Sequence, residues 1–314
     1  MTIAIVVHGG AGLISPDRAD AVQAGCRAAT RLGWDILRNG GSALDAVEAA
    51  VRALEDDPNY NAGTGAVLTT EGTIELDAGI MEGRNLNAGA IADVQFIKNP
   101  VSLARKVLES PHVLLVGKGA QMFAHEQGIA PCKFEDLLTE RQYRRWQERH
   151  QISVHDDAEE PRYHRQEVGS TTAREENSEE KHGTVGAVAL DQSGLLVAAA
   201  STGGIPYKYP GRVGDSPLVG CGFYADENAA ISCTGQGEDF IRLLIARRAA
   251  EFVARGDSAR AAAEAAIAVL GAKASGTGGL IIVDRLGNAG FAWNSQHMVY
   301  AYMTETTPEP VAGI

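Results

Sequence analysis

The stretch Gly183-Thr184-Val185-Gly186-Ala187-Val188-Ala189-Leu190 decides how the rest of this chain is interpreted. Its last six residues are apolar or glycine, and such a run predicts a buried strand. The residues before it, Thr171 to Lys181, are too hydrophilic to form a packed core. Thr184 therefore lies where a polar segment meets a buried strand.

A threonine in this place suggests a specific chemistry. If the peptide bond between Gly183 and Thr184 were cut, Thr184 would carry a free α-amine beside its β-hydroxyl. An N-terminal amine can serve as the base for such a hydroxyl, because its reference pKa of about 7.7–8.0 lies near neutrality. Gly183 permits the strained backbone angles that would expose its carbonyl to Thr184 Oγ. These residues predict a self-processing hydrolase, although Gly-Thr also begins strands that have no such chemistry.

The composition indicates which partners the protein can bind and in which cellular compartment it is expected. The 314 residues allow one large domain or two smaller ones. Forty acidic residues against 28 basic ones give a net charge of −12, which argues against nucleic acid or an anionic membrane as the main partner. The four cysteines form no CxxC pair, which favours reduced thiols. No signal peptide or membrane-spanning stretch is evident, so we expect a cytoplasmic protein.

Local patterns in the first half predict strands and capped helices. Ser15 and Ser42 are typical N-cap residues, and Asn39-Gly40-Gly41 and Asp57-Pro58 are typical helix ends. The expected elements are a strand at 3–8, helices from 16 and from 43, a hairpin at 66–69 and 73–76, a helix from 100, a strand at 113–116, a helix at 118–127 and a polar tail compatible with a helix at 134–149.

The second half begins with a charged segment and continues with hairpins. Residues 150–181 are mostly charged or polar, with too few apolar residues to form a core, so we expect weak order there. The elements expected after it are a hairpin at 185–190 and 195–200, a strand at 231–234, helices at 238–254 and 258–270, a hairpin at 280–284 and 288–293, and a strand at 298–303. Hairpins that alternate with helix pairs predict stacked sheets covered by helices.

Six short motifs follow one another along the chain: His8-Gly9-Gly10-Ala11-Gly12, Tyr60-Asn61-Ala62-Gly63, Gly183-Thr184-Val185-Gly186-Ala187-Val188-Ala189, Ser201-Thr202-Gly203-Gly204, Pro210-Gly211-Arg212-Val213-Gly214-Asp215-Ser216-Pro217 and Ser232-Cys233-Thr234-Gly235-Gln236-Gly237-Glu238. In this order they resemble the plant-type (type III) L-asparaginases, also called isoaspartyl peptidases, of the N-terminal nucleophile (Ntn) hydrolases. The resemblance spans nearly the whole chain except the hydrophilic segment before Thr184.

The resemblance implies an α+β fold, a four-layer αββα sandwich, in a chain that cleaves itself. Residues 1–183 would form the α subunit, with a hydrophilic linker at about 150–183, and residues 184–314 the β subunit of the same domain. The implied assembly is an (αβ)2 homodimer of cleaved protomers. The implied substrates are small molecules, L-asparagine and β-aspartyl dipeptides, with no nucleic acid or membrane partner. No organic cofactor is implied, but a structural sodium ion is.

The resemblance also implies roles for residues around the cleavage site. Thr184 matches the nucleophile, and Thr202 a second threonine that holds its proton network. Thr234 and Gly235 match the oxyanion hole, where a hydroxyl and a backbone N–H meet developing negative charge. Gly237 would let the main chain approach the substrate. Without the resemblance, Thr202 would be an ordinary strand-end residue and Thr234 an ordinary helix cap.

Substrate and ion binding are implied at three further places. Arg212 and Asp215 match a clamp for the carboxylate and ammonium of an α-amino acid, although an Arg and an Asp three residues apart more often form a surface ion pair. Asn61 matches an asparagine that supports the site. A sodium-binding loop of main-chain carbonyls, which suit a hard cation, would use Leu54, Glu55, Asp57, Tyr60, Ala62 and Thr64.

Two features depart from the family pattern or leave an alternative. Residues 205–209, Ile-Pro-Tyr-Lys-Tyr, are bulkier than the polar Thr/Asn-type sequence common there, which leaves substrate preference and turnover open. His182 is not typical of the family, and a solvated linker histidine is the simplest interpretation. Gly183 replaces the Asp of glycosylasparaginases and points away from them. The alternative to an enzyme is an uncleaved relative that binds amino acids or serves as a scaffold.

Overall fold

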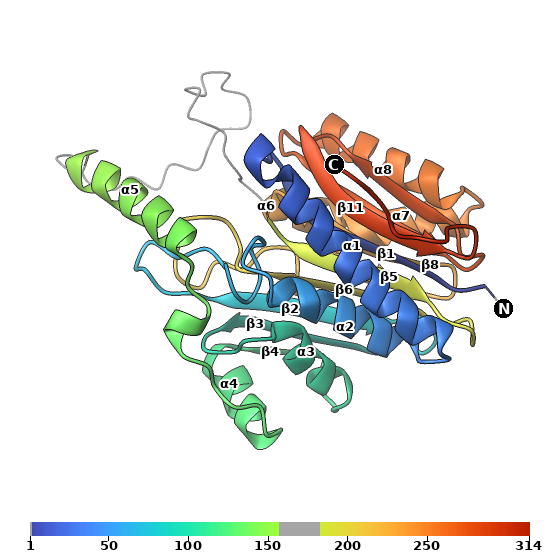
Figure 1. The fold of residues 1–314 in the computed structure, drawn as a ribbon, viewed down its shortest axis with the longest axis horizontal. Helices are drawn as coiled ribbons and strands as arrows, with labels where there is room; N and C mark the ends of the chain where they lie inside the picture. The colour runs from blue at the N-terminus through green and yellow to red at the C-terminus, as the bar shows by residue number, and fades with distance from the viewer. Residues whose placement is uncertain (1, 157–182) are drawn as a thin grey trace.

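The computed structural model describes residues 2–156 and 183–314, which form mixed α/β structure (Figure 1). Its helices are α1 Pro16–Arg38, α2 Ala43–Glu55, α3 Pro100–Leu108, α4 Gly117–Glu126, the 3₁₀ helix Phe134–Asp136, α5 Glu140–Asp156, α6 Gly237–Leu243, α7 Ile245–Ala254 and α8 Ala259–Lys273.

The strands of the described residues form two sheets. The first has eight strands in the order β12-β11-β1-β5-β6-β2-β3-β4, antiparallel throughout except for the β3–β4 pair. The second has four antiparallel strands in the order β10-β9-β8-β7. Their bounds are β1 Ala4–Gly12, β2 Leu76–Glu82, β3 Ala88–Val94, β4 Leu114–Val116, β5 Val185–Leu190, β6 Leu196–Thr202, β7 Phe223–Ala225, β8 Ala229–Gly235, β9 Gly278–Asp284, β10 Ala289–Trp293, β11 His297–Thr304 and β12 Val311–Gly313.

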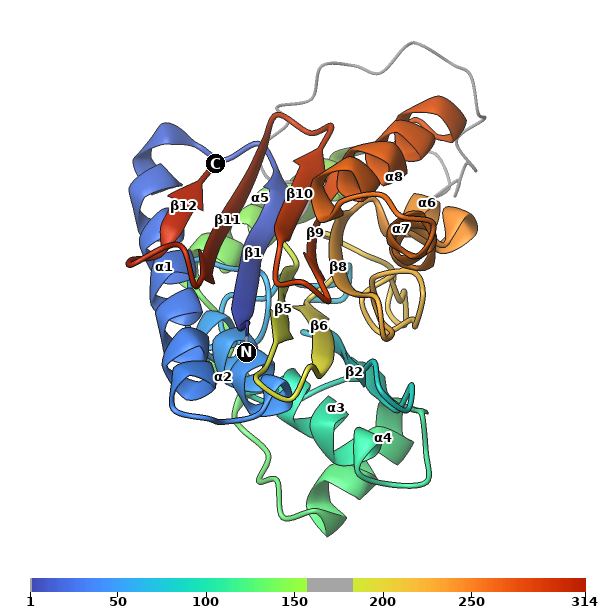
Figure 2. The same cartoon turned by 90° about the vertical axis from the view of Figure 1, so that its right-hand side faces the viewer.

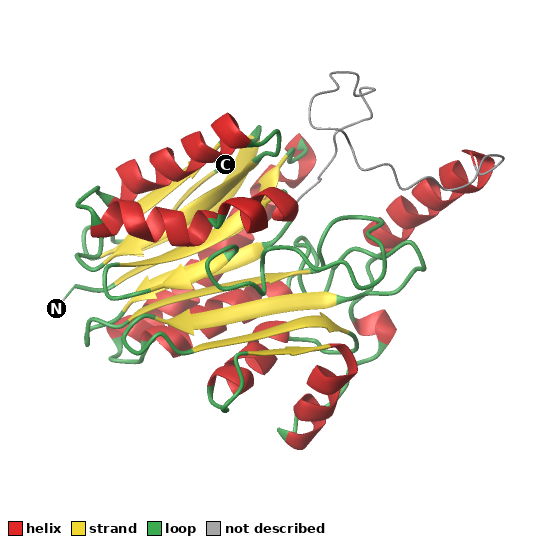
Figure 3. Cartoon of the chain, turned by 180° about the vertical axis from the view of Figure 1, so that it is seen from behind, coloured by secondary structure: helices red, strands yellow, loops and turns green. Residues whose placement is uncertain are grey.

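Alternation along the strands divides the buried residues into separate cores. In β1, Ile5 and Val7 belong to the core beneath α1, α2 and α3, whereas Ala4 and Val6 belong to the core between the two sheets. A further core lies between the four-stranded sheet and helices α7 and α8. Figures 2 and 3 show the strands enclosed by helices on their outer sides. Even-numbered residues of β5, of β6 and of β1 as far as His8 therefore face the second sheet, whereas Ala11 does so after a shift in the β1 register.

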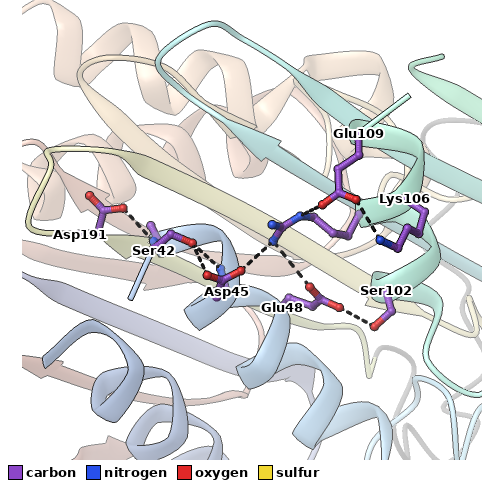
Figure 4. A network of polar contacts seen from close by, with 9 residues as sticks. Ser42, Asp45, Glu48, Ser102, Lys106, Glu109 and Asp191 are labelled. Carbon is purple, nitrogen blue, oxygen red and sulfur yellow. Dashed lines mark hydrogen bonds and ion pairs between the residues drawn. The ribbon is translucent and has the colours of Figure 1, made fainter. Parts of the chain in front are cut away.

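A polar network fixes the end of β5 that lies away from Thr184 (Figure 4). Asp191, in the turn after β5, accepts the Ala43 N–H at 2.9 Å, and Ser42 caps α2 through the Asp45 N–H at 3.1 Å. Arg105 of α3 lies 3.4 Å from an Asp45 carboxylate oxygen. Helices α2 and α3 are thereby held to the β5–β6 hairpin.

Several predicted elements are confirmed, and others are wrong. The hairpins β5–β6 and β9–β10 and the helices after Ser15, Ser42 and Asn99 form as expected. The hairpin expected at 66–69 and 73–76 does not, because those residues form a turn in which the Thr69 N–H bonds the Thr73 carbonyl at 2.9 Å. The first hairpin is instead β2–β3. The helix expected at 238–254 is broken at Leu244, whose φ is +52°.

Part of the segment expected to be weakly ordered is helical. Residues 150–156 continue helix α5 and do not belong to a linker. The rest of the predicted linker, residues 157–182 with His182, lies outside the described residues. All four cysteines are free thiols, as expected from their spacing.

Candidate active site

Thr184 and Thr202 meet at one end of the β5–β6 hairpin. Val185 pairs with Ser201 in the antiparallel register, so the next residues outward, Thr184 and Thr202, come opposite each other. The Thr184 hydroxyl donates to Thr202 Oγ1 at 3.1 Å, and both side chains are buried. Thr202 Oγ1 also accepts the Gly204 N–H at 3.0 Å. The structure thus brings the predicted nucleophile and its predicted partner together.

Thr234 reaches the same region from the second sheet. Its Oγ1 accepts the Ala11 N–H of β1 at 3.2 Å. Because β1 is antiparallel to β5 with His8 opposite Gly186, residues that follow His8 lie beside the Thr184 end of β5. Thr234 is completely buried in the core region between the sheets. A hydroxyl that accepts one hydrogen bond there still has its own proton to donate.

Gly235 can only be glycine in this backbone. Its φ is +156°, and a Cβ would lie 2.6 Å from the Thr277 carbonyl oxygen and 2.7 Å from Phe240 Cε2. Gly237 is similarly confined, because a Cβ would lie 3.0 Å from Arg212 Nη2. The missing side chains let the start of α6 approach the segment that carries the predicted clamp.

The predicted clamp is built from one exposed pairing and one buried acid. Arg212 donates to the Glu238 carboxylate through Nε and Nη2, each at 2.9 Å. Asp215 is 4% exposed, and no described residue donates a hydrogen bond to its Oδ2. Burial raises the pKa of Asp215 to about 7, against the opposing charge of Arg212. The Oδ2 atom of Asp215 can therefore accept a hydrogen bond from a cationic ligand.

Asn61 fixes both sides of the predicted cleavage site. Its backbone N–H donates to the Gly183 carbonyl at 3.2 Å, and its carbonyl accepts the Gly203 N–H at 3.0 Å. Its amide donates to the Gly204 carbonyl at 2.7 Å and accepts the Val67 N–H at 2.9 Å. Asn61 therefore positions Gly183 relative to the turn after Thr202.

All six residues of the predicted sodium loop lie at or directly after the end of α2. Main-chain oxygens converge at two glycines there. A Cβ at Gly63 would lie 2.6 Å from the Glu55 carbonyl oxygen and 2.7 Å from that of Lys98, and one at Gly65 would lie 2.6 Å from that of Tyr60. Burial raises the pKa of the Glu55 carboxyl to about 8, and the Glu55 main-chain carbonyl accepts the Thr64 N–H at 2.8 Å. Main-chain carbonyl oxygens are the kind of donor that a hard cation prefers, and a sodium ion at this loop stays a prediction.

Comparisons with known proteins agree with this arrangement. A sequence profile described as asparaginase matches residues 1–312. The chain belongs to this asparaginase family. It is 48% identical to the plant-type L-asparaginase of Pyrococcus abyssi, over 99% of this chain and all of that protein. It is 43% identical to the human isoaspartyl peptidase/L-asparaginase, over 95% of this chain and 92% of that protein.

In this member of the asparaginase family, the unusual segment at 205–209 is docked on helix α5. The Tyr207 hydroxyl lies 3.2 Å from His150 Nδ1, and the His150 ring stacks on Trp146 at 4.8 Å between centroids. Arg149 Nη1 donates to the Pro206 carbonyl at 3.1 Å. The bulk that departs from the family pattern is thus in contact with a helix of the first half of the chain.

Sequence reasoning missed one buried group beside the predicted nucleophile. His8 Nε2 lies 3.1 Å from Ser232 Oγ, whose hydroxyl donates to the Ala199 carbonyl at 2.9 Å. Burial lowers the pKa of His8 to about 3, so the ring is neutral and ties β1 to β8. The sequence feature that could have revealed this group is the position of His8, which lies on the same face of the predicted strand as Ala4 and Val6, the face that packs against the second sheet.

The described helices offer nothing that could cross a membrane, since none is both long and apolar enough.

Proposed function

We propose that this chain is a self-processing amidohydrolase that cleaves the side-chain amide of L-asparagine and the isopeptide bond of β-aspartyl dipeptides. The names of the P. abyssi and human relatives support these substrates. The observation that carries the proposal is the buried Thr184 hydroxyl, which lies 3.1 Å from Thr202 Oγ1 and directly follows Gly183.

Self-cleavage would start with attack of Thr184 Oγ on the Gly183 carbonyl carbon. The ester C–O bond forms, the C–N bond breaks, and the proton lost by Oγ is transferred to the nitrogen, which becomes the α-amine of Thr184. Water then hydrolyses the ester, which leaves a Gly183 carboxylate and restores the hydroxyl. Asn61 holds the Gly183 carbonyl through its backbone N–H and so supports this geometry.

Hydrolysis of the substrate would use the released amine as the base. The amine takes the proton of Thr184 Oγ, and Oγ attacks the side-chain carbonyl of asparagine. The Thr234 hydroxyl and the Gly235 N–H would donate to the resulting oxyanion. Ammonia, or the amino acid of a dipeptide, leaves with the transferred proton. Water then releases L-aspartate from the acyl-enzyme.

The clamp would recognise the two charges that every α-amino acid carries. Asp215 accepts the substrate ammonium, which supplies the hydrogen-bond donor that Oδ2 does not find among the described residues. Arg212 binds the carboxylate, either beside Glu238 or in its place. The raised pKa of Asp215 then falls when the ammonium binds, because an opposite charge favours the ionised carboxyl.

We extend the proposal to the architecture and the assembly of the processed protein. The helices and sheets would form the four-layer αββα sandwich of the Ntn hydrolases, with residues 1–183 as the α subunit and 184–314 as the β subunit. Two such αβ pairs would form an (αβ)2 dimer. When bound, a sodium ion at the loop after α2 would stiffen the loop without entering the chemistry. Its ligands would be the carbonyl oxygens of Leu54, Glu55, Asp57, Tyr60, Ala62 and Thr64.

Mass spectrometry combined with an activity assay tests this function. After incubation, the purified protein should give two fragments, the second beginning at Thr184, and should release ammonia from asparagine and the free amino acid from a β-aspartyl dipeptide. Thr184→Ala should abolish cleavage and hydrolysis together. A chain that stays full-length and binds amino acids without hydrolysing them would instead be the uncleaved binding relative.

A further inference from the structure

A buried lysine lies in the unusual segment between Thr202 and Arg212. The side chain of Lys208 has no solvent exposure, and that of Glu75 is 4% exposed. Lys208 Nζ donates to the Glu75 carbonyl at 3.1 Å and lies 3.6 Å from the Glu75 Oε2. Burying an ion pair costs desolvation energy that the attraction between the charges often only balances. Stability alone is therefore a weak explanation for this pair.

The pair connects the two loops that carry the predicted site. On one side, Glu75 Oε2 accepts the Gly211 N–H at 2.9 Å, and Gly211 immediately precedes Arg212. On the other side, a Cβ at Gly204 would lie 2.9 Å from Lys208 Cδ and 3.3 Å from Nζ. Gly204 also donates its N–H to Thr202 Oγ1. The lysine thus touches the turn after Thr202 and, through Glu75, the start of the clamp.

A second buried acid belongs to the same group of charges. Asp77 is completely buried, and in the β2–β6 register it lies opposite Thr202. Its Oδ1 accepts the Asp93 N–H at 2.8 Å. Burial raises the pKa of Asp77, and the charges of Lys208 and Arg212 oppose this rise. Lys208 therefore lies near two buried acids, Glu75 and Asp77, and the second of these is opposite Thr202 in the sheet.

We propose that Lys208 is a positioning residue, whose ammonium fixes the distance between Thr202 and the clamp formed by Arg212 and Asp215. The inference rests on the proposed function, because it assigns the clamp to an amino-acid ligand. Lys208 itself touches no substrate. Its effect reaches the ligand through Glu75 and Gly211 on one side and through Gly204 on the other.

The test compares Lys208→Met, Glu75→Gln and the double variant with the wild type. Lys208→Met keeps most of the side-chain volume but leaves the Glu75 carboxylate buried without its cation. The double variant removes both charges and so relieves that imbalance. Lys106→Met is the matched control, because it removes a lysine from an ion pair with Glu109 in which both side chains are 43% exposed.

Three readouts are needed: the affinity for L-aspartate by titration calorimetry, KM and kcat for asparagine, and the melting temperature. We expect Lys208→Met to weaken L-aspartate binding and raise KM at least tenfold, while kcat falls less than threefold. The double variant should recover the melting temperature but not the affinity. Lys106→Met should match the wild type in affinity and KM.

Two results would overturn the positioning role. One is that Lys208→Met binds L-aspartate with the same affinity as the wild type, even if its self-cleavage is impaired. The other is recovery of both stability and affinity in the double variant, which would mean that the pair serves folding alone. Failure of the proposed function looks different, since the wild type would then bind L-aspartate without hydrolysing asparagine, and the affinity ratios would still decide the role of Lys208.

Discussion

The buried carboxyl of Asp215 should make the stability of the ligand-free protein depend on pH. Its pKa rises from 3.8 to about 7 on folding, because burial disfavours the charged form. Between these values the folded protein holds a proton that the unfolded chain has lost, so stability falls as pH increases. Asp215→Asn has nearly the same shape and cannot ionise. It should therefore lose this pH dependence.

The size of the effect follows from the pH interval. Between pH 5 and about 7 the carboxyl is protonated when folded and ionised when unfolded, at about 1.4 kcal/mol per pH unit. The difference in the free energy of unfolding, Asp215→Asn minus the parent protein, should thus increase by about 2.7 kcal/mol from pH 5 to pH 8. Other buried acids, such as Glu55, are present in both proteins, and their effects largely cancel in the difference.

Urea unfolding at the two pH values measures this difference. Both proteins should carry Thr184→Ala, so that neither is cleaved and unfolding involves a single chain. Ser216→Ala in the same background is the control. Ser216 is the buried neighbour of Asp215, its hydroxyl has no hydrogen-bond partner among the described residues, and it does not titrate between pH 5 and pH 8. If Asp215→Asn and its parent differ by the same free energy at pH 5 and pH 8, the assignment of a buried, protonated Asp215 is wrong.

Three further changes test other parts of the structure. Thr234→Val removes the proposed oxyanion donor and should lower kcat about 10²–10³-fold with little effect on KM, as steady-state kinetics on asparagine would show. Trp146→Ala removes the stack on His150 and the 2.8 Å hydrogen bond to the Thr69 carbonyl, so limited proteolysis should cut α5 faster and unfolding should cost up to about 3 kcal/mol less. Glu55→Gln should melt at a higher temperature than the wild type at pH 9 but not at pH 5, because the pKa of Glu55 is raised from 4.5 to about 8 and stability falls as pH rises between them.

The parts of the fold that sequence predicts well are those whose local preference agrees with their final environment. The hairpin β5–β6 is buried along the whole of both strands, and the helix after Ser42 has both a cap and a buried face. Strand β2 was missed because Asp77 and Gly79 have low strand propensity. A side chain at Gly79 would collide with the Phe223 ring, so its glycine reflects a contact between the two sheets that no local pattern reveals.

The site shows the same division between local and distant information. Ordered motifs located Thr184, Thr202 and Thr234, and the register then brings the first two opposite each other. His8 and Ser232 are 224 positions apart in the sequence, so no local pattern around either residue predicts their contact. Lys208 was noticed only as part of a bulky segment. Its importance depends on Glu75, which belongs to a loop that sequence analysis had placed in a hairpin.

Sheet order explains how a cut chain could keep an intact site. In the eight-stranded sheet, β1 from the first half lies between β11 and β5 of the second half. Strand β2 then pairs with β6, so the two halves alternate across the sheet and share three strand pairings. The bond between Gly183 and Thr184 lies just before β5, outside every pairing. Breaking that bond would free the Thr184 amine while every hydrogen bond between the β1, β2, β5, β6 and β11 strands stays in place. The position of Thr184 is thus determined by the sheet and not by its covalent link to Gly183, which is the condition for a nucleophile that becomes active only after cleavage.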